Sequence, residues 1–133
     1  MQAAYALVIL GVVAVALQYH WLRRNNRAVQ RTAVMRSFAE VVRTNVPPNA
    51  TLVHVNEPFA VQTYLNTISP YVTIERAAEL MRSSSPVFVV LKNPASLAQQ
   101  VGSNQVHIIH QEGERDKVFL VSNRPRANPS VGQ

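Results

Sequence analysis

An uninterrupted apolar run near the N-terminus constrains the fold of this chain more than any other feature. From Ala3 to Leu22, about 20 residues carry no charged side chain, and as an α-helix they would extend roughly 30 Å. This length matches the hydrocarbon thickness of a lipid bilayer. The run therefore predicts one membrane-spanning helix.

The end of the run carries the residue types that are typical of a membrane–water interface. Tyr19 and Trp21 are amphipathic aromatic residues, Arg23 and Arg24 follow directly, and Arg27 adds a third positive charge. We expect residues 1–24 to form a single-pass transmembrane helix with an arginine stop. The lipid bilayer is its expected partner, and these five side chains are its expected interface residues.

A cleavable signal peptide is the alternative, because Ala14-Val15-Ala16 fits the small-residue pattern before a cleavage site. Such a peptide starts with a positive region, whereas only Met1 and Gln2 precede the apolar run. Arginines directly after the run also favour a retained span. By the positive-inside tendency, the same arginines would place the following domain in the cytoplasm.

The net charge of +6 does not indicate a nucleic-acid-binding protein, because the charge is not concentrated on the domain. From Ala28 onward, the chain contains ten Lys or Arg residues and seven Asp or Glu residues, and the basic residues form no run. Binding to nucleic-acid phosphates requires a concentrated basic face. The absence of cysteine excludes disulfides, thiol nucleophiles and cysteine-ligated metals.

Residues 25–45 predict an amphipathic helix between the span and the domain, with Asn25-Asn26 as a weak point between the two helices. Val34, Phe38, Val41 and Val42 recur at helical spacing and form one apolar stripe. A stripe this short favours packing on its own domain over lying on the lipid surface.

Residues 46–124 predict a small α/β domain. Pro47-Pro48 ends the preceding helix, and Asn93-Pro94 and Gly102 fit the start and end of a later one. The expected strands are 51–55, a short extended piece at 71–73, 87–91, 106–110 and 118–121, the last two as a hairpin. The expected helices lie near 56–65, 74–82 and 94–101. This alternation favours a mixed, partly parallel sheet in an α/β sandwich of two or three layers. The tail 125–133 is predicted to be disordered.

Catalytic and metal sites are not expected. His107 and His110 suggest a metal, but positions i and i+3 of a strand point to opposite faces, and no Asp, Cys or third His is suitably spaced. Ser83-Ser84-Ser85 lacks the sequence of a nucleophile elbow, and no glycine-rich phosphate loop follows the first strand. We therefore predict no catalytic residue, no metal and no cofactor.

His54 and Glu57 are the candidate ligand-binding residues, because they flank the end of the first strand. Open α/β sheets bind ligands at the carboxyl ends of their strands. We nevertheless favour the simpler interpretation, a surface histidine near a glutamate of the helix cap.

Four short motifs carry a family resemblance: Pro47-Pro48-Asn49-Ala50, Thr63-Tyr64-Leu65, Glu79-Leu80 and Pro86-Val87-Phe88-Val89-Val90. With the preceding span, they resemble the last transmembrane helix and C-terminal extracytoplasmic domain of polytopic glycosyltransferases that use polyprenyl-phosphate sugars. These are of the dolichyl-phosphate-mannose protein mannosyltransferase and lipid A aminoarabinose transferase types. The catalytic acid of that family lies in a loop between other membrane helices, so no catalytic residue is carried over.

The resemblance implies an extracytoplasmic domain, against the expectation from the arginines, and we follow the resemblance. It implies a non-catalytic C-terminal module or fragment of a membrane glycosyltransferase, acting in docking or acceptor access beside a polytopic subunit. The alternative is a single-pass, membrane-anchored α/β binding or assembly domain without enzymatic activity.

Overall fold

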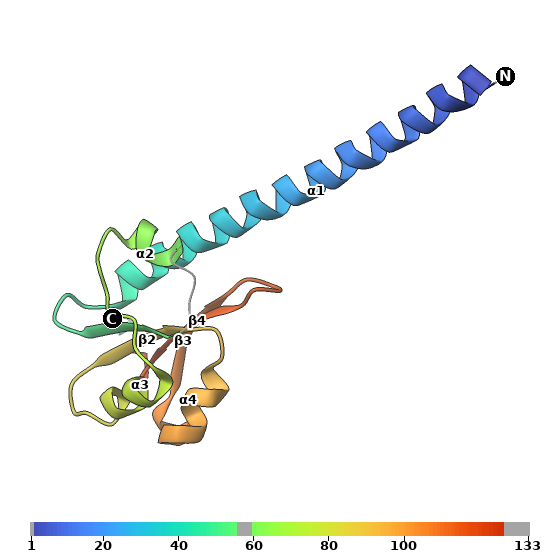
Figure 1. The fold of residues 1–133 in the computed structure, drawn as a ribbon. Helices are drawn as coiled ribbons and strands as arrows, with labels where there is room; N and C mark the ends of the chain where they lie inside the picture. Colours follow the sequence, from blue (N-terminus) through green and yellow to red (C-terminus); the bar gives the residue numbers. More distant parts are fainter. Residues whose placement is uncertain (1, 56–59, 127–133) are drawn as a thin grey trace, which may run out of the picture. The chain divides into compact units, whose positions relative to one another are not determined.

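The computed structural model describes residues 2–55 and 60–126. The chain divides into two compact units, Met1–Ala33 and Val34–Gln133. Helix α1, Gln2–Asn45, contributes to both units, and the strands and the other helices belong to the second (Figure 1).

The first unit consists of the exposed part of α1. The helix continues through Asn25 and Asn26, because asparagine inside a helix costs only a few tenths of a kcal/mol (~0.5) relative to alanine. Among the described residues, α1 is the one helix that is long and apolar enough to cross a membrane.

The second unit is built on a four-stranded mixed sheet with the strand order β1-β2-β4-β3. β1 (Thr51–Val55) pairs in parallel with β2 (Val87–Leu91), and β4 (Val118–Ser122) pairs antiparallel with both β2 and β3 (His107–Glu112). β3 and β4 form the predicted hairpin. The prediction of a mixed, partly parallel sheet is therefore confirmed.

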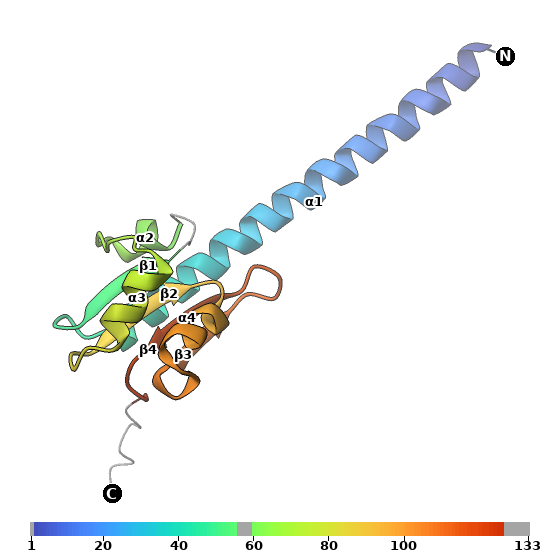
Figure 2. The ribbon, with the colours of Figure 1, turned by 60° about the horizontal axis from the view of Figure 1, so that its bottom comes forward.

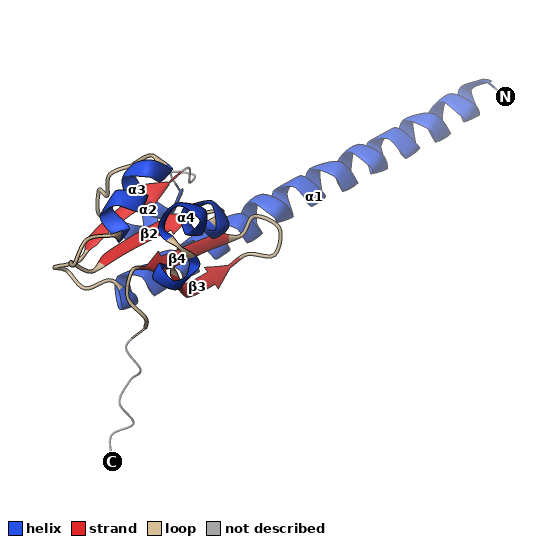
Figure 3. Cartoon of the chain, turned by 90° about the horizontal axis from the view of Figure 1, so that it is seen from below, coloured by secondary structure: helices blue, strands red, loops and turns tan. Residues whose placement is uncertain are grey.

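Helices cover both faces of the sheet, so the second unit has three layers (Figures 2 and 3). One core lies under α3 (Ile74–Met81) and α4 (Pro94–Val101) and includes Val89 and Val121. The other core lies under α2 (Ala60–Leu65) and the last turns of α1, and it includes Val90 and Leu120. All five residues of β2 are buried, as expected for a strand that is covered on both faces.

Local signals in the sequence set the ends of the short helices. Thr73 caps α3 by accepting a hydrogen bond from the backbone N–H of Arg76, and Asn93 caps α4 through the N–H of Ala95. Gly102 ends α4 with a φ of 96°, a conformation that favours glycine, and a short 3₁₀ turn, Ser103–Gln105, follows. The predicted cap at Asn56 lies outside the described residues, as does the predicted tail from residue 127 onward.

The last turns of α1 belong to the core of the domain. Met35, Phe38, Ala39 and Val42 are each no more than 1% exposed and pack in the core that faces α2. The amphipathic helix thus packs on its own domain, as predicted. The buried stripe is centred on Met35 and Ala39 instead of the predicted Val34 and Val41, which stay partly exposed.

Candidate functional site

His54 is buried in the domain. Its side chain is 0% exposed, and its ring centroid lies 5.6 Å from that of Tyr71 with a 45° angle between the rings. Its backbone N–H donates to the carbonyl of Pro70 over 3.0 Å, and its carbonyl accepts from the N–H of Val72 over 2.9 Å. The prediction of a surface histidine is therefore wrong, because the segment around Tyr71 runs along β1 and pairs with it at His54.

The second member of the predicted ligand pair, Glu57, lies outside the described residues. His54 shares its sheet face with Val90, its register partner on β2, and therefore points into the core that contains α2. Aromatic packing against Tyr71 gives this histidine a structural role that the sequence did not indicate.

His107 and His110 lie on the same face of β3, against the prediction of opposite faces. A β-bulge at Ile109 is the reason: His107 pairs with Ser122 and His110 pairs with Leu120, so one extra residue is accommodated between them. Residues two apart on β4 share a face, and their register partners on β3 share it too. The alternation of side chains between the two faces of a strand is therefore interrupted at the bulge.

The ring of His110 connects the hairpin with α1. Its centroid lies 6.1 Å from that of Phe38, and its Nε2 lies 3.3 Å from Oε2 of Glu112. The side chains of this His–Glu pair are 34% and 22% exposed. Within residues 2–55 and 60–126, no group of three or more His, Cys, Asp or Glu side chains is arranged to hold a metal ion.

The serine segment Ser83–Ser85 is held by Asn123, directly after β4. The Nδ2 group of Asn123 donates to the carbonyls of Met81, Ser83 and Ser85 at 3.3, 3.1 and 2.9 Å, and its Oδ1 accepts from the N–H of Val87 at 3.0 Å. The serines therefore form an anchored turn before β2. No pattern in the sequence distinguishes Asn123 from other asparagines that follow a strand.

Glu75 is the acidic residue in the first turn of α3. Its own backbone N–H and the hydroxyl of Thr73 donate hydrogen bonds to the carboxylate and lower its pKa below the ordinary value. Gln100 adds a smaller effect in the same direction, and desolvation opposes them. The side chain thus stabilises the start of the helix.

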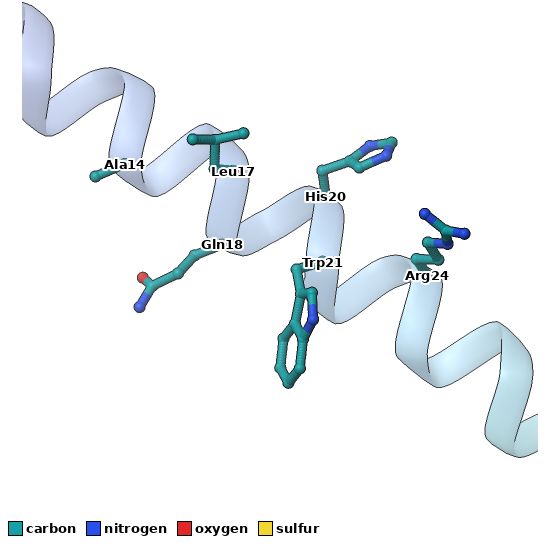
Figure 4. Close-up of a pocket in the computed structure, with 6 residues that line it drawn as sticks. All are labelled: Ala14, Leu17, Gln18, His20, Trp21 and Arg24. Atoms are coloured by element: carbon teal, nitrogen blue, oxygen red, sulfur yellow. The ribbon is translucent and has the colours of Figure 1, made fainter.

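The predicted interface residues are exposed on α1. Tyr19 and Trp21 are 66% and 63% exposed, and the arginines that follow are exposed as well. A shallow depression on this helix is lined by Ala14, Leu17, Gln18, His20, Trp21 and Arg24. Figure 4 shows Gln18 and Trp21 pointing to one side of the helix, and His20 and Arg24 pointing to the other.

Comparison with known proteins adds a structural likeness. No protein-family model and no curated protein matches the chain. The chain is similar in fold to part of ArnT. The crystal structure of ArnT from Cupriavidus metallidurans in the apo state matches it with a TM-score of 0.52 and 14% sequence identity, over 71% of this chain. The chain spans 20% of the ArnT chain, and at this identity the likeness shows the fold alone.

Proposed function

We propose that this chain is a non-catalytic C-terminal module of a membrane glycosyltransferase that uses a lipid-linked sugar donor. In this proposal, α1 anchors the module in the bilayer, and the α/β domain docks on a polytopic catalytic subunit or shapes the access of the acceptor. The observation that carries the proposal is the fold likeness to ArnT, an aminoarabinose transferase that uses a polyprenyl-phosphate sugar.

The sequence resemblance supports the same proposal from different observations. The motifs around Pro47-Pro48, Tyr64-Leu65 and Pro86 resemble the C-terminal domain of polyprenyl-phosphate-sugar glycosyltransferases, a class to which ArnT belongs. In the structure, these motifs lie at the end of α1, at the end of α2 and directly before β2. They therefore lie where helices and strands of the domain begin or end. A mixed sheet that follows an apolar helix is the architecture that the resemblance implies.

A role in docking or acceptor access is favoured because three polar side chains that are candidates for a site make contacts within the domain. His54 is buried beside Tyr71, the ring of His110 lies near that of Phe38 and approaches Glu112, and Asn123 holds a turn. These contacts fix the shape of the domain. A rigid domain with an exposed helical and loop surface suits the recognition of a partner.

An extracytoplasmic domain is part of the proposal, and the cysteine-free sequence allows a direct test. Gln99 is exposed on α4, so a single Gln99→Cys substitution adds an accessible thiol without disturbing the core. We expect a membrane-impermeant maleimide to label it in intact cells. Labelling only after permeabilisation would contradict this orientation and favour the one that the arginines indicate.

The alternative function is a membrane-anchored binding or assembly domain that acts without a transferase. The second unit favours it, because its sheet is covered on both faces by helices of the same chain and buries two cores. A domain with complete cores does not need a partner to bury its apolar residues.

Co-purification from the native membrane separates the two functions. The full chain is solubilised in a mild detergent, and stoichiometric partners are identified by mass spectrometry. A polytopic protein with acidic extracytoplasmic loops is the expected partner. A Phe38→Ala variant is the matched control, since it keeps the span and loosens the domain, and it should lose a partner that docks on the domain. A wild-type chain that is isolated alone would refute the transferase proposal and leave the anchored domain.

A further inference from the structure

Helix α1 carries four arginines and one histidine on one side, around the end of its apolar segment. His20, Arg23, Arg24, Arg27 and Arg31 lie at positions i, i+3, i+4, i+7 and i+11 of this helix. At about 100° of rotation per residue, these positions fall within an arc of about 100°. All five side chains are exposed, and Figure 4 shows His20 and Arg24 extending from the same side of the helix. We call these five residues the positive stripe.

The charge of the positive stripe is not offset by neighbouring acids in the sequence. The first acidic residue of the chain is Glu40, nine residues after Arg31. Side chains on one helix approach each other at spacings of three or four residues, so Glu40 is too far along the helix to pair with the stripe. No acidic residue therefore lies within helical reach of these arginines along α1, which leaves them open to an external anion.

The position of the stripe along α1 indicates where that anion lies. Tyr19 and Trp21 are aromatic residues of the kind that gather at the headgroup level of a bilayer. From His20 to Arg31 the helix rises about 16 Å, whereas the headgroup region on each side of the hydrocarbon is roughly 5–8 Å thick. His20, Arg23 and Arg24 would thus lie at headgroup depth, with the other arginines just outside it.

We propose that the positive stripe binds the phosphate groups of anionic phospholipids. This inference rests on the part of the proposed function that places α1 in a membrane, and not on the glycosyltransferase assignment. A guanidinium group donates two parallel hydrogen bonds to a phosphate, which makes arginine well suited to this ligand. Leu17 lines the same shallow depression as His20 and Arg24 and offers an apolar contact for an acyl chain (Figure 4).

The single tryptophan of the chain provides the assay, because Trp21 adjoins the stripe. The purified full chain is reconstituted into phosphatidylcholine vesicles that contain a small fraction of a brominated lipid, which quenches tryptophan on contact. Quenching by brominated phosphatidylglycerol is compared with quenching by brominated phosphatidylcholine. A basic residue near an anionic surface contributes about 1 kcal/mol, which corresponds to roughly fivefold enrichment of the anionic lipid beside Trp21.

Two double variants make the test specific. Arg23→Gln with Arg24→Gln removes two charges at headgroup depth. We expect the ratio of quenching by brominated phosphatidylglycerol to quenching by brominated phosphatidylcholine, the preference, to fall close to one. Arg115→Gln with Lys117→Gln removes the same charge from exposed positions of the β3–β4 hairpin and should keep the preference. Added salt should weaken the preference of the wild type, since it screens exposed charges.

Equal quenching by the two lipids in the wild-type chain would overturn the proposal. So would a preference that survives in the Arg23 and Arg24 double variant, or one that the hairpin variant loses equally. Far-UV circular dichroism confirms that each variant keeps α1 before the quenching is interpreted. The assay contains no partner protein, so its failure would leave the co-purification test of the transferase function unaffected.

Discussion

The replacement of Phe38 by alanine tests whether the last turns of α1 are part of the domain core. Phe38 is 0% exposed and lies in the core shared by α1, α2 and the sheet, with its ring 6.1 Å from that of His110. Truncation of a buried phenylalanine costs about 3–5 kcal/mol, from lost burial and from the cavity that remains. Domains of this size have unfolding free energies of about 5–15 kcal/mol. The variant should therefore lose between about a fifth and all of its stability.

Hydrogen exchange is the suitable assay, because the helical signal of α1 would mask domain unfolding in circular dichroism. Exchange in full-length protein in detergent micelles is followed by mass spectrometry for β2 and β4, whose buried amides open only with the domain. We expect Phe38→Ala to lower the free energy that protects these amides from exchange by about 3–5 kcal/mol. The loss cannot exceed the unfolding free energy of the wild-type domain. Val29→Ala is the matched control on the same helix; Val29 is 61% exposed, so its effect should stay within about 0.5 kcal/mol.

A change of less than about 1 kcal/mol in the protection of β2 and β4 would refute this account of the core. The domain would then be stable without the side chain of Phe38, and the last turns of α1 would not contribute to its core. A Phe38→Leu variant adds a check on the mechanism. It retains most of the buried apolar volume, so it should cost less than the alanine variant.

Three further predictions concern the edges of the domain. Asn123→Ala should cost about 1–3 kcal/mol and raise hydrogen exchange in the serine turn, because three carbonyls and one N–H lose their partner. Gly113→Ala should cost at least about 1–2 kcal/mol in thermal unfolding, since φ is 91° and a Cβ would lie 2.6 Å from the carbonyl oxygen of Asp116. Thr73→Ala should raise the pKa of Glu75 in a carboxyl NMR titration; the lowered pKa stabilises the fold at higher pH and this contribution is lost on acidification, so the variant should depend less on pH in the acidic range.

The parts of the fold that the sequence predicted well are those that depend on neighbouring residues. The cap residue Asn93 with Pro94 and the glycine at Gly102 correctly bounded α4. The continuous apolar run Val87–Leu91 correctly identified a strand buried on both faces. Such signals act within one or two turns of chain, so no knowledge of the tertiary structure is needed to interpret them.

The predictions that failed depend on contacts between distant parts of the chain. His54 was expected at the surface, but it is buried, and a segment 17 residues later pairs with its strand at Tyr71, whose ring packs against the imidazole. His107 and His110 were expected on opposite faces, but a bulge that depends on the pairing with β4 places them on one. The local sequence predicted an extended piece at 71–73, but neither its pairing with β1 nor the bulge leaves a pattern in the local sequence.

The polar side chains of the domain and those of α1 differ in what they contact. In the domain, His54, His110 and Asn123 each contact a residue that is distant in the sequence: Tyr71, Phe38 and the serine turn, respectively. On α1, the positive stripe from His20 to Arg31 is exposed and has no acidic residue at helical contact distance in the sequence. Side chains engaged within the fold contribute to stability, whereas an uncompensated row of guanidinium groups contributes attraction for an external anion. The two proposals use this division: the rigid domain presents a surface to a protein partner, and the stripe on α1 attracts lipid phosphate.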